Sequence, residues 1–307
     1  MNASMSRREL VLFLVTLFAA TWGLEILATV RVGNLHDSRA VPYLLGCMFL
    51  PAVWTLFWLW RRPQLRGAVR WRLGRPLPSL AGALIPAAIA LIALLALVGL
   101  GWATSNNLVL STAGVEVVKG PWLLGKGIES WPFFLLNFAW TGLAFGVINS
   151  SAAVGEEVGW RGLLQGQFAA RWGVLPGVAV LGLVWAFWHL PANLAGYNHA
   201  ENPVLGAFLL FPLELVADSF VMAWLTRRAG SFWPAVLYHG SGNGILEGVA
   251  HASIVPAVPR LWVDSLVVAV TLLAGALAAW ALAREERRAA APEATLARVP
   301  AAPAQAS

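Results

Sequence analysis

VGEEVGWRGLL, residues 154–164, contains two adjacent glutamates and an arginine within a region that is otherwise apolar. The whole chain has the composition of a membrane protein, because 59% of its 307 residues are hydrophobic, 12% are charged and the mean hydropathy is +0.69. A charged group near the centre of a bilayer costs about 2.5–3.5 kcal/mol even on lenient insertion scales. Glu156 and Glu157 are therefore the first candidates for functional residues.

The apolar segments around this stretch predict an all-α, polytopic membrane protein, a bundle of about eight transmembrane helices. We expect one membrane domain, residues 1–283, with the functional motifs within residues 132–250. From residue 284 onward a charged run and an Ala/Pro-rich run indicate a cytoplasmic, disordered tail, residues 284–307. The predicted spans are residues 10–30, 41–60, 80–104, 133–154, 174–190, 204–225, 233–250 and 261–283.

The distribution of basic residues predicts the orientation. With the N-terminus inside, sixteen of the 21 Lys and Arg residues fall on the inner side and five fall outside. Cytoplasmic loops carry such an excess, so we expect an integral, multi-pass protein of a bacterial plasma membrane with both termini in the cytoplasm. The basic balance then reflects orientation and contact with anionic lipids, and no nucleic-acid partner is required.

Helical spacing separates the two glutamates. Glu157 and Arg161 are four residues apart, with the acid first, which is the favourable orientation for an ion pair. Glu156 points about 100° away, so Arg161 is less well placed to neutralise it. The alternative is that both acids share Arg161 at the cytoplasmic interface.

Three further polar residues lie in later apolar segments. His189 ends one segment just before a proline, whereas His239 and Asn243 lie one helical turn apart in another. Measured from the turn at residues 171–173, Glu156 and His189 lie at about the same height, roughly 24 Å. His239 lies roughly 13 Å from the turn at Gly230, so a shared site requires the first hairpin to project about 10 Å further. As alternatives, His189 packs at the interface and the His239–Asn243 pair joins helices by hydrogen bonds.

Together these residues resemble the CPBP family of intramembrane proteases, which includes type II CAAX prenyl endopeptidases and the ABI (abortive-infection) proteins. Residues 156–161 resemble the family's EExxxR motif, residues 185–189 its FxxxH motif and residues 239–243 its HxxxN motif. Trp185 stands where the family motif has phenylalanine, and we expect it to preserve packing. The resemblance covers residues 149–244.

The resemblance implies catalytic roles for four residues. Glu156, assisted by His189, would activate a water that attacks a peptide carbonyl, while His239 and Asn243 would stabilise the oxyanion. Glu157 and Arg161 would hold the helix and orient Glu156. We expect no cofactor. The alternative is a zinc ion bound by Glu156, His189 and His239.

The leading prediction is thus an intramembrane endopeptidase that acts on a membrane-associated peptide or a CAAX-like protein C-terminus. A non-catalytic bacteriocin-immunity or binding protein and a proton-coupled transporter are the alternatives. Four acids in the apolar segments stay unassigned, namely Glu25, Glu214, Asp218 and Glu247. The single cysteine, Cys47, excludes a disulfide and a Cys-based metal site, and is interpreted as packing. His36, His199 and His251 are expected to be solvated.

Overall fold

The computed structural model describes residues 4–245 and 254–296 and confirms an all-α architecture. The long helices are α1 (Arg7–Val32), α2 (Val41–Arg61), α3 (Pro76–Gly99), α4 (Trp131–Glu157), α9 (Phe211–Ala229) and α11 (Arg260–Leu296). The shorter helices are α5 (Gln165–Trp172), α6 (Val174–Trp188), α7 (Leu190–Leu194), α8 (Pro203–Leu205) and α10 (Trp233–Ser241). The π-helical segments Val158–Leu164 and Gly206–Leu210 join α4 to α5 and α8 to α9, and residues 242–245 after α10 are also π-helical.

Within the described residues, six helices are long and apolar enough to cross a membrane, which confirms the prediction of a multi-pass membrane protein. The predicted fifth span is the shorter apolar helix α6, and the seventh begins with α10 but continues into residues outside the described ranges. The third span ends earlier than predicted, at Gly99, because Gly101 has a φ of 69° and Ala103–Ser105 form a strand. Helix α11 continues to Leu296, beyond the predicted boundary at residue 283.

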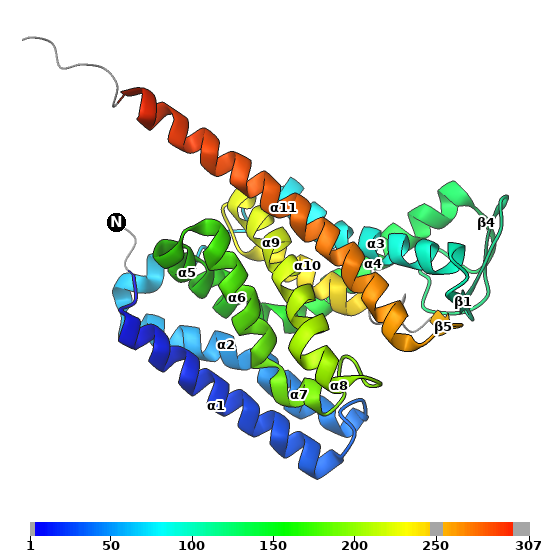
Figure 1. The fold of residues 1–307 in the computed structure, drawn as a ribbon, viewed down its shortest axis with the longest axis horizontal. Coiled ribbons are helices and arrows are strands. Elements are labelled where there is room, and N and C mark those ends of the chain that lie inside the picture. Colours follow the sequence, from blue (N-terminus) through cyan, green and yellow to red (C-terminus); the bar gives the residue numbers. More distant parts are fainter. Residues whose placement is uncertain (1–3, 246–253, 297–307) are drawn as a thin grey trace, which may run out of the picture.

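Five short strands, which we did not predict, lie in the connections at one end of the molecule. Strand β1 (Ala103–Ser105) pairs antiparallel with β5 (Ile254–Pro256), so the end of α3 is joined to the start of α11. Strands β2 (Leu108–Leu110), β3 (Gly114–Val117) and β4 (Gly127–Ser130) form an antiparallel sheet between α3 and α4. This end lies far from the N-terminus (Figure 1).

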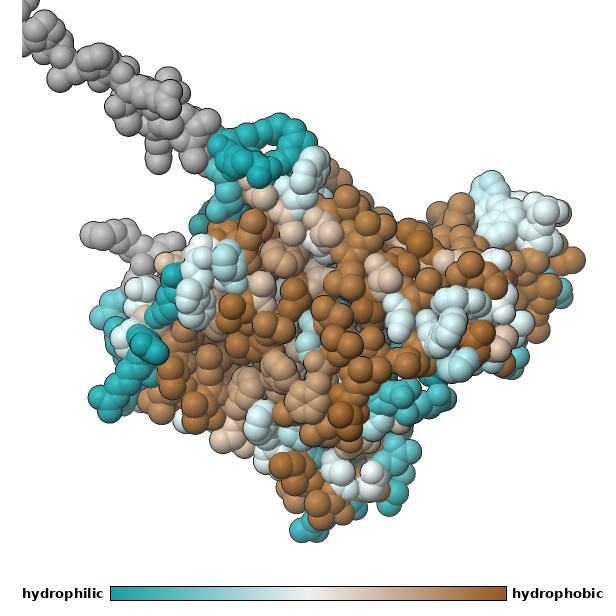
Figure 2. Space-filling model, viewed as in Figure 1, coloured by the Kyte–Doolittle hydropathy of each residue, from teal (hydrophilic) through white to brown (hydrophobic). Residues whose placement is uncertain are grey.

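The helices form a bundle around α10 and α4. Helix α10 packs on α4 and α3, α9 packs between α6 and α11, and α1 packs on α2 at one side of the molecule (Figure 1). Hydrophobic residues cover most of the face shown in Figure 2, with hydrophilic residues gathered toward its ends. Leu273, for example, is 63% exposed on α11, as a lipid-facing residue of a membrane helix would be.

Close helix contacts fix the height of the glutamate pair. At Gly155, just before the pair, an added Cβ would lie 2.6 Å from the Met48 carbonyl oxygen, so α4 and α2 approach backbone to backbone. Gly240 makes a similar contact between α10 and α4, where a Cβ would lie 2.6 Å from the Gly146 carbonyl oxygen. Small residues at such crossings let membrane helices pack closely.

Candidate functional site

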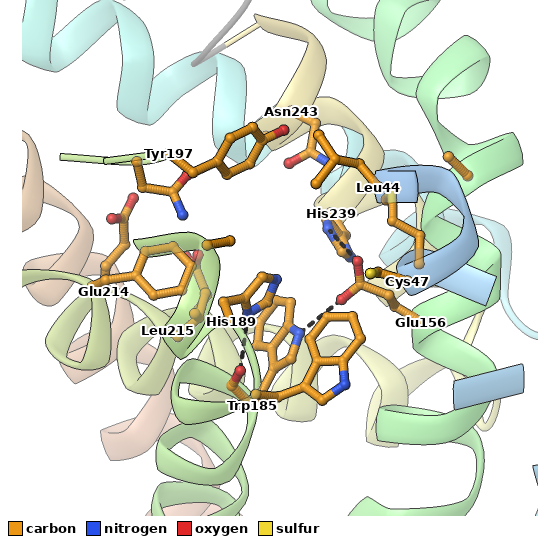
Figure 3. Close-up of a pocket in the computed structure, with 18 of the residues that line it drawn as sticks. Leu44, Cys47, Glu156, Trp185, His189, Tyr197, Glu214, Leu215, His239 and Asn243 are labelled. Atoms are coloured by element: carbon orange, nitrogen blue, oxygen red, sulfur yellow. Dashed lines mark hydrogen bonds and ion pairs between the residues drawn. The ribbon is translucent and has the colours of Figure 1, made fainter. Parts of the chain in front are cut away.

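Four residues that we predicted as catalytic line one cavity of about 620 Å³ (Figure 3). Glu156 comes from the end of α4, His189 from the junction of α6 and α7, and His239 from α10. Asn243 comes from the π-helical residues 242–245 that follow α10. The structure thus brings together side chains that are up to 87 residues apart in the chain, as a shared site requires.

The Glu156 carboxylate is almost fully buried at the wall of this cavity. It is 2% exposed, and its Oε2 accepts a hydrogen bond of 2.8 Å from the indole Nε1 of Trp185. Its Oε1 lies 4.0 Å from Nε2 of His239. One carboxylate oxygen is therefore held by the indole, and the other faces the imidazole (Figure 3).

Glu157 binds two partners from different helices. Its carboxylate accepts from Arg161 at 3.0 and 3.1 Å, which is the ion pair that the four-residue spacing predicted. The Oε1 atom also lies 2.9 Å from Nδ1 of His239. Because an ionised carboxylate only accepts, Nδ1 carries the proton of this bond and Nε2 is left to face Glu156.

Arg161 is fully enclosed. Its side chain is 0% exposed, its second terminal nitrogen donates to Ser219 Oγ at 2.9 Å, and its guanidinium stacks over the Trp185 ring at 4.0 Å. Among the described contacts its hydrogen bonds to acids go to Glu157, while Glu156 bonds to Trp185. This arrangement differs from the alternative in which both glutamates pair with Arg161.

His189 is held by its own helix. Its Nδ1 lies 3.0 Å from the Trp185 carbonyl oxygen, and its ring packs edge-on against Trp188 and Phe211, with centroids 4.6 and 5.2 Å apart. A carbonyl only accepts, so Nδ1 carries the proton and Nε2 is available as an acceptor. His189 lines the same cavity as Glu156, so the alternative in which it only packs at the interface is not supported.

Three of the unassigned acids also line the cavity. Asp218 accepts a hydrogen bond of 2.6 Å from the Tyr238 hydroxyl, and Glu25 accepts one of 3.2 Å from the Ala192 backbone. Glu214 lies on the far side, next to Tyr197 (Figure 3). The fourth acid, Glu247, lies outside the described residues.

Two sequence interpretations need correction. His199 is not solvated, because it is only 8% exposed. Its Nδ1 lies 3.1 Å from Asp264 Oδ2, and this contact compensates for its burial. Trp185 does more than pack, since its indole binds Glu156. The sequence contained one signal for this bond, because tryptophan in place of the family's phenylalanine adds an indole N–H donor. Cys47 is buried at the cavity wall, and His251 lies outside the described residues.

The described donor side chains around the cavity do not have the arrangement of a metal site. Among the side chains of residues 4–245 and 254–289, no three His, Cys, Asp or Glu residues are arranged to hold a metal ion. The set proposed for zinc, Glu156, His189 and His239, does not fit this requirement. We therefore derive no step through a metal.

The comparisons with known proteins bear on this part of the chain. The family model described as type II CAAX prenyl endopeptidase, Rce1-like, matches residues 127–245. This part of the chain is therefore similar to the Rce1-like family. A search of curated proteins found no match.

The Rce1-like match contains all three motifs and confirms the predicted resemblance. It begins at strand β4 and ends two residues after Asn243, so the segment that builds most of the cavity is the matched segment. Together with the membrane-spanning helices, the Rce1-like match supports a CAAX protease-like enzyme of the membrane. Residues 1–126 lie outside the match, although α1 and α2 close the site through Glu25 and Cys47.

Proposed function

We propose that this chain is an intramembrane endopeptidase in which Glu156 activates the water that hydrolyses a peptide bond. The observation that carries this proposal is the 4.0 Å approach of Glu156 and His239 at the wall of a cavity that His189 and Asn243 also line. A cavity of about 620 Å³ is of the size that holds small ligands or a few residues of peptide.

In the proposed reaction, Glu156 takes a proton from water as the water oxygen bonds to the carbonyl carbon of the substrate. The electron pair of the carbonyl moves to its oxygen. His239, with both ring nitrogens protonated, donates from Nε2 to this oxyanion while Nδ1 stays on Glu157, and the Asn243 amide donates as well. When the oxyanion collapses, the C–N bond breaks and Glu156 returns its proton to the leaving amine, with His189 Nε2 helping to orient the water.

The supporting residues act on Glu156 and His239. Trp185 fixes one Glu156 oxygen, and Glu157 fixes the ring of His239. Arg161 neutralises Glu157 and holds the indole of Trp185 from its other face. Such a supporting shell holds reacting groups within a few tenths of an ångström of a productive geometry.

The Asn243→Ala variant tests the proposed oxyanion hole. We expect it to lower the rate of peptide cleavage by about 10²–10³, which is the usual cost of losing one such donor. Cleavage would be measured with purified protein in liposomes and membrane-associated peptides, with and without a prenyl group. Asn106→Ala, at an exposed position between β1 and β2, is the control. Equal rates for the two variants would remove Asn243 from the mechanism.

The Trp185→Phe variant restores the aromatic residue of the family motif but removes the indole donor. Because a hydrogen bond to a charged group contributes about 1.5–3 kcal/mol, we expect kcat to fall about 10- to 100-fold with little change in KM. Trp188→Phe is the matched control, since that indole donates to the Thr21 hydroxyl at 2.8 Å. If kcat falls no further in Trp185→Phe than in Trp188→Phe, the hydrogen bond from Trp185 does not position Glu156.

We also propose that hydrolysis needs no metal. The lack of a suitable three-ligand group within the described residues supports this. We expect cleavage to persist after dialysis against a strong chelator. Activity that is lost on chelation and returns with added Zn²⁺ would instead support a metal site at Glu156, His189 and His239.

The proposed substrate is a membrane-associated peptide, a membrane protein or a CAAX-like protein C-terminus. We further propose that the protein lies in a bacterial plasma membrane with both termini in the cytoplasm, where the arginine-rich end contacts anionic lipids. The predicted topology, which assigns sixteen of the 21 basic residues to the inner side, supports this orientation, although Arg161, one of the sixteen, is buried beside Glu157.

A further inference from the structure

The helical backbone breaks at His189, one of the residues that line the cavity. Helix α6 ends at Trp188, α7 begins at Leu190, and His189 between them has φ −88° and ψ 8°. Pro191 follows, and a proline has no N–H to donate to the carbonyl four residues before it, which here is that of Phe187. The break therefore leaves backbone polar groups on both sides of His189 that need other partners.

Two side chains of α1 bind these backbone groups. The indole Nε1 of Trp22 donates to the carbonyl oxygens of Phe187 and Trp188, at 3.3 and 3.1 Å. The carboxylate of Glu25 accepts a hydrogen bond of 3.2 Å from the Ala192 N–H, which in an unbroken helix would donate to the Trp188 carbonyl. Helix α1 thus replaces two of the hydrogen bonds that a continuous helix would make across the break.

These contacts are shielded from water. Glu25 is 2% exposed, Ala192 is 1% exposed and Trp22 is half-buried, where α1 packs on α7 (Figure 1). A buried N–H without an acceptor is unfavourable, so the start of α7 stays where Glu25 can reach it. Helix α1 lies outside residues 127–245, so the segment similar to the Rce1-like family supplies His189 but not the side chains that hold its backbone.

The His189 ring depends on this backbone. Its Nδ1 is tied to the Trp185 carbonyl oxygen at 3.0 Å, so the ring keeps its direction only while the last turn of α6 keeps its shape. The carbonyls bound by Trp22 belong to that same turn. A shift of the turn would move the ring away from Glu156, and a misplacement of about 1 Å can cost about 10² in rate.

We infer that Trp22 and Glu25 of α1 are positioning residues for His189. Trp22 holds the carbonyl end of α6, and Glu25 holds the first turn of α7, so the break between them carries the imidazole at a fixed place in the cavity. This assigns a role to Glu25, an acid that the proposed reaction does not use. The effect on cleavage rests on the proposed function, whereas the hold on the His189 ring is a separate property of the structure.

Two substitutions of Glu25 test the hydrogen bond to α7. Glu25→Leu removes the acceptor, and we expect kcat to fall about tenfold while KM changes by less than about twofold. Glu25→Gln keeps an amide oxygen for the Ala192 N–H and is expected to recover most of that loss. If Glu25→Gln loses as much as Glu25→Leu, or if KM rises while kcat stays, Glu25 does not act through this bond and the inference is wrong.

Trp22→Phe tests the other contact. It keeps an aromatic ring but removes the donor to the carbonyls of α6, and we expect a fall in kcat of about tenfold. The matched control is Trp54→Phe, since the Trp54 indole donates to the Thr16 hydroxyl of the same helix α1 at 2.8 Å, away from the break. Equal losses in the two variants would show that general packing of α1 is the cause, which overturns the inference.

A double-variant cycle asks whether α1 acts through His189. Residues that work through one group give non-additive effects. Glu25→Leu is therefore expected to lower kcat in the native chain but to change it by less than about twofold in a His189→Ala background. If the two losses multiply, Glu25 affects the rate by another route.

Nuclear magnetic resonance of the histidine rings tests the inference without activity. The chain has five histidines, and the His189 ring signal is the one that disappears in His189→Ala. In detergent micelles we expect Trp22→Phe and Glu25→Leu to shift this signal and Trp54→Phe to leave it in place. An unshifted His189 signal in the first two variants overturns the inference. If wild type cleaves nothing, or if His189→Ala is too slow for the cycle, the ring signal alone decides, and only the first of these results counts against the proposed function.

Discussion

Glu156→Gln is expected to lower the rate of peptide cleavage by about 10²–10⁴, the usual contribution of a general base. Glutamine has nearly the same shape and still accepts the hydrogen bond from the Trp185 indole, but it cannot take a proton from water. We therefore expect the unfolding temperature in detergent to stay close to that of the wild type. The measurement is the cleavage rate at saturating peptide in liposomes.

The control for this variant is Glu116→Gln, which makes the same change at an exposed position in strand β3. It should cleave at the wild-type rate. Full activity in Glu156→Gln would rule out the proposed mechanism, whereas loss of activity with a much lower unfolding temperature would leave a structural role as the explanation.

Arg161→Met is expected to have the largest effect on stability. It leaves the Glu157 carboxylate buried without its arginine, and breaking a buried ion pair on one side costs about 3–5 kcal/mol. It also removes the bond to Ser219 and the stacking on Trp185. The free energy of unfolding would be measured by denaturation in mixed micelles.

Two variants separate the buried charge from other causes. Arg228→Met removes an exposed arginine that pairs with Glu285, and such a pair contributes about 0–1 kcal/mol. In the double variant Glu157→Gln/Arg161→Met both charges are gone, so we expect it to recover part of the stability that Arg161→Met loses. The interpretation is wrong if Arg161→Met costs no more than Arg228→Met.

Contacts within one helix could be predicted from the sequence. Glu157 and Arg161 are four residues apart, and helical geometry alone brings them together, as the 3.0 Å contact confirms. The apolar segments likewise predicted the membrane helices, because each is long enough to cross the bilayer. The turns at Gly173 and Gly230 followed from glycine, which adopts the positive φ found at both positions.

Contacts between helices could not be predicted in the same way. The bond between His239 and Glu157 depends on how α10 is rotated against α4, and that rotation is set by backbone packing at Gly240 and Gly146. We expected Glu157 and Arg161 to hold the helix and orient Glu156, and the contact of Glu157 with the ring of His239 was not predicted. The five strands were missed because they are only three or four residues long and carry no hydropathy signal of their own.

The chemistry at Trp185 was predicted only in part. Its place one turn before His189 indicated packing, and its ring does pack against His239 with centroids 5.3 Å apart. Which way the indole N–H points depends on the side-chain rotamer in the assembled bundle. The sequence shows that a donor is present, but its acceptor comes from another helix.

The most direct test of the central claim is the product formed in ¹⁸O-labelled water. Purified protein in liposomes would be incubated with a membrane-associated peptide, and the fragments would be weighed by mass spectrometry. Activated-water hydrolysis predicts two fragments, with one ¹⁸O in the new C-terminal carboxylate, and no fragments with Glu156→Gln. Peptide that is bound or carried across the membrane but stays intact would contradict the account.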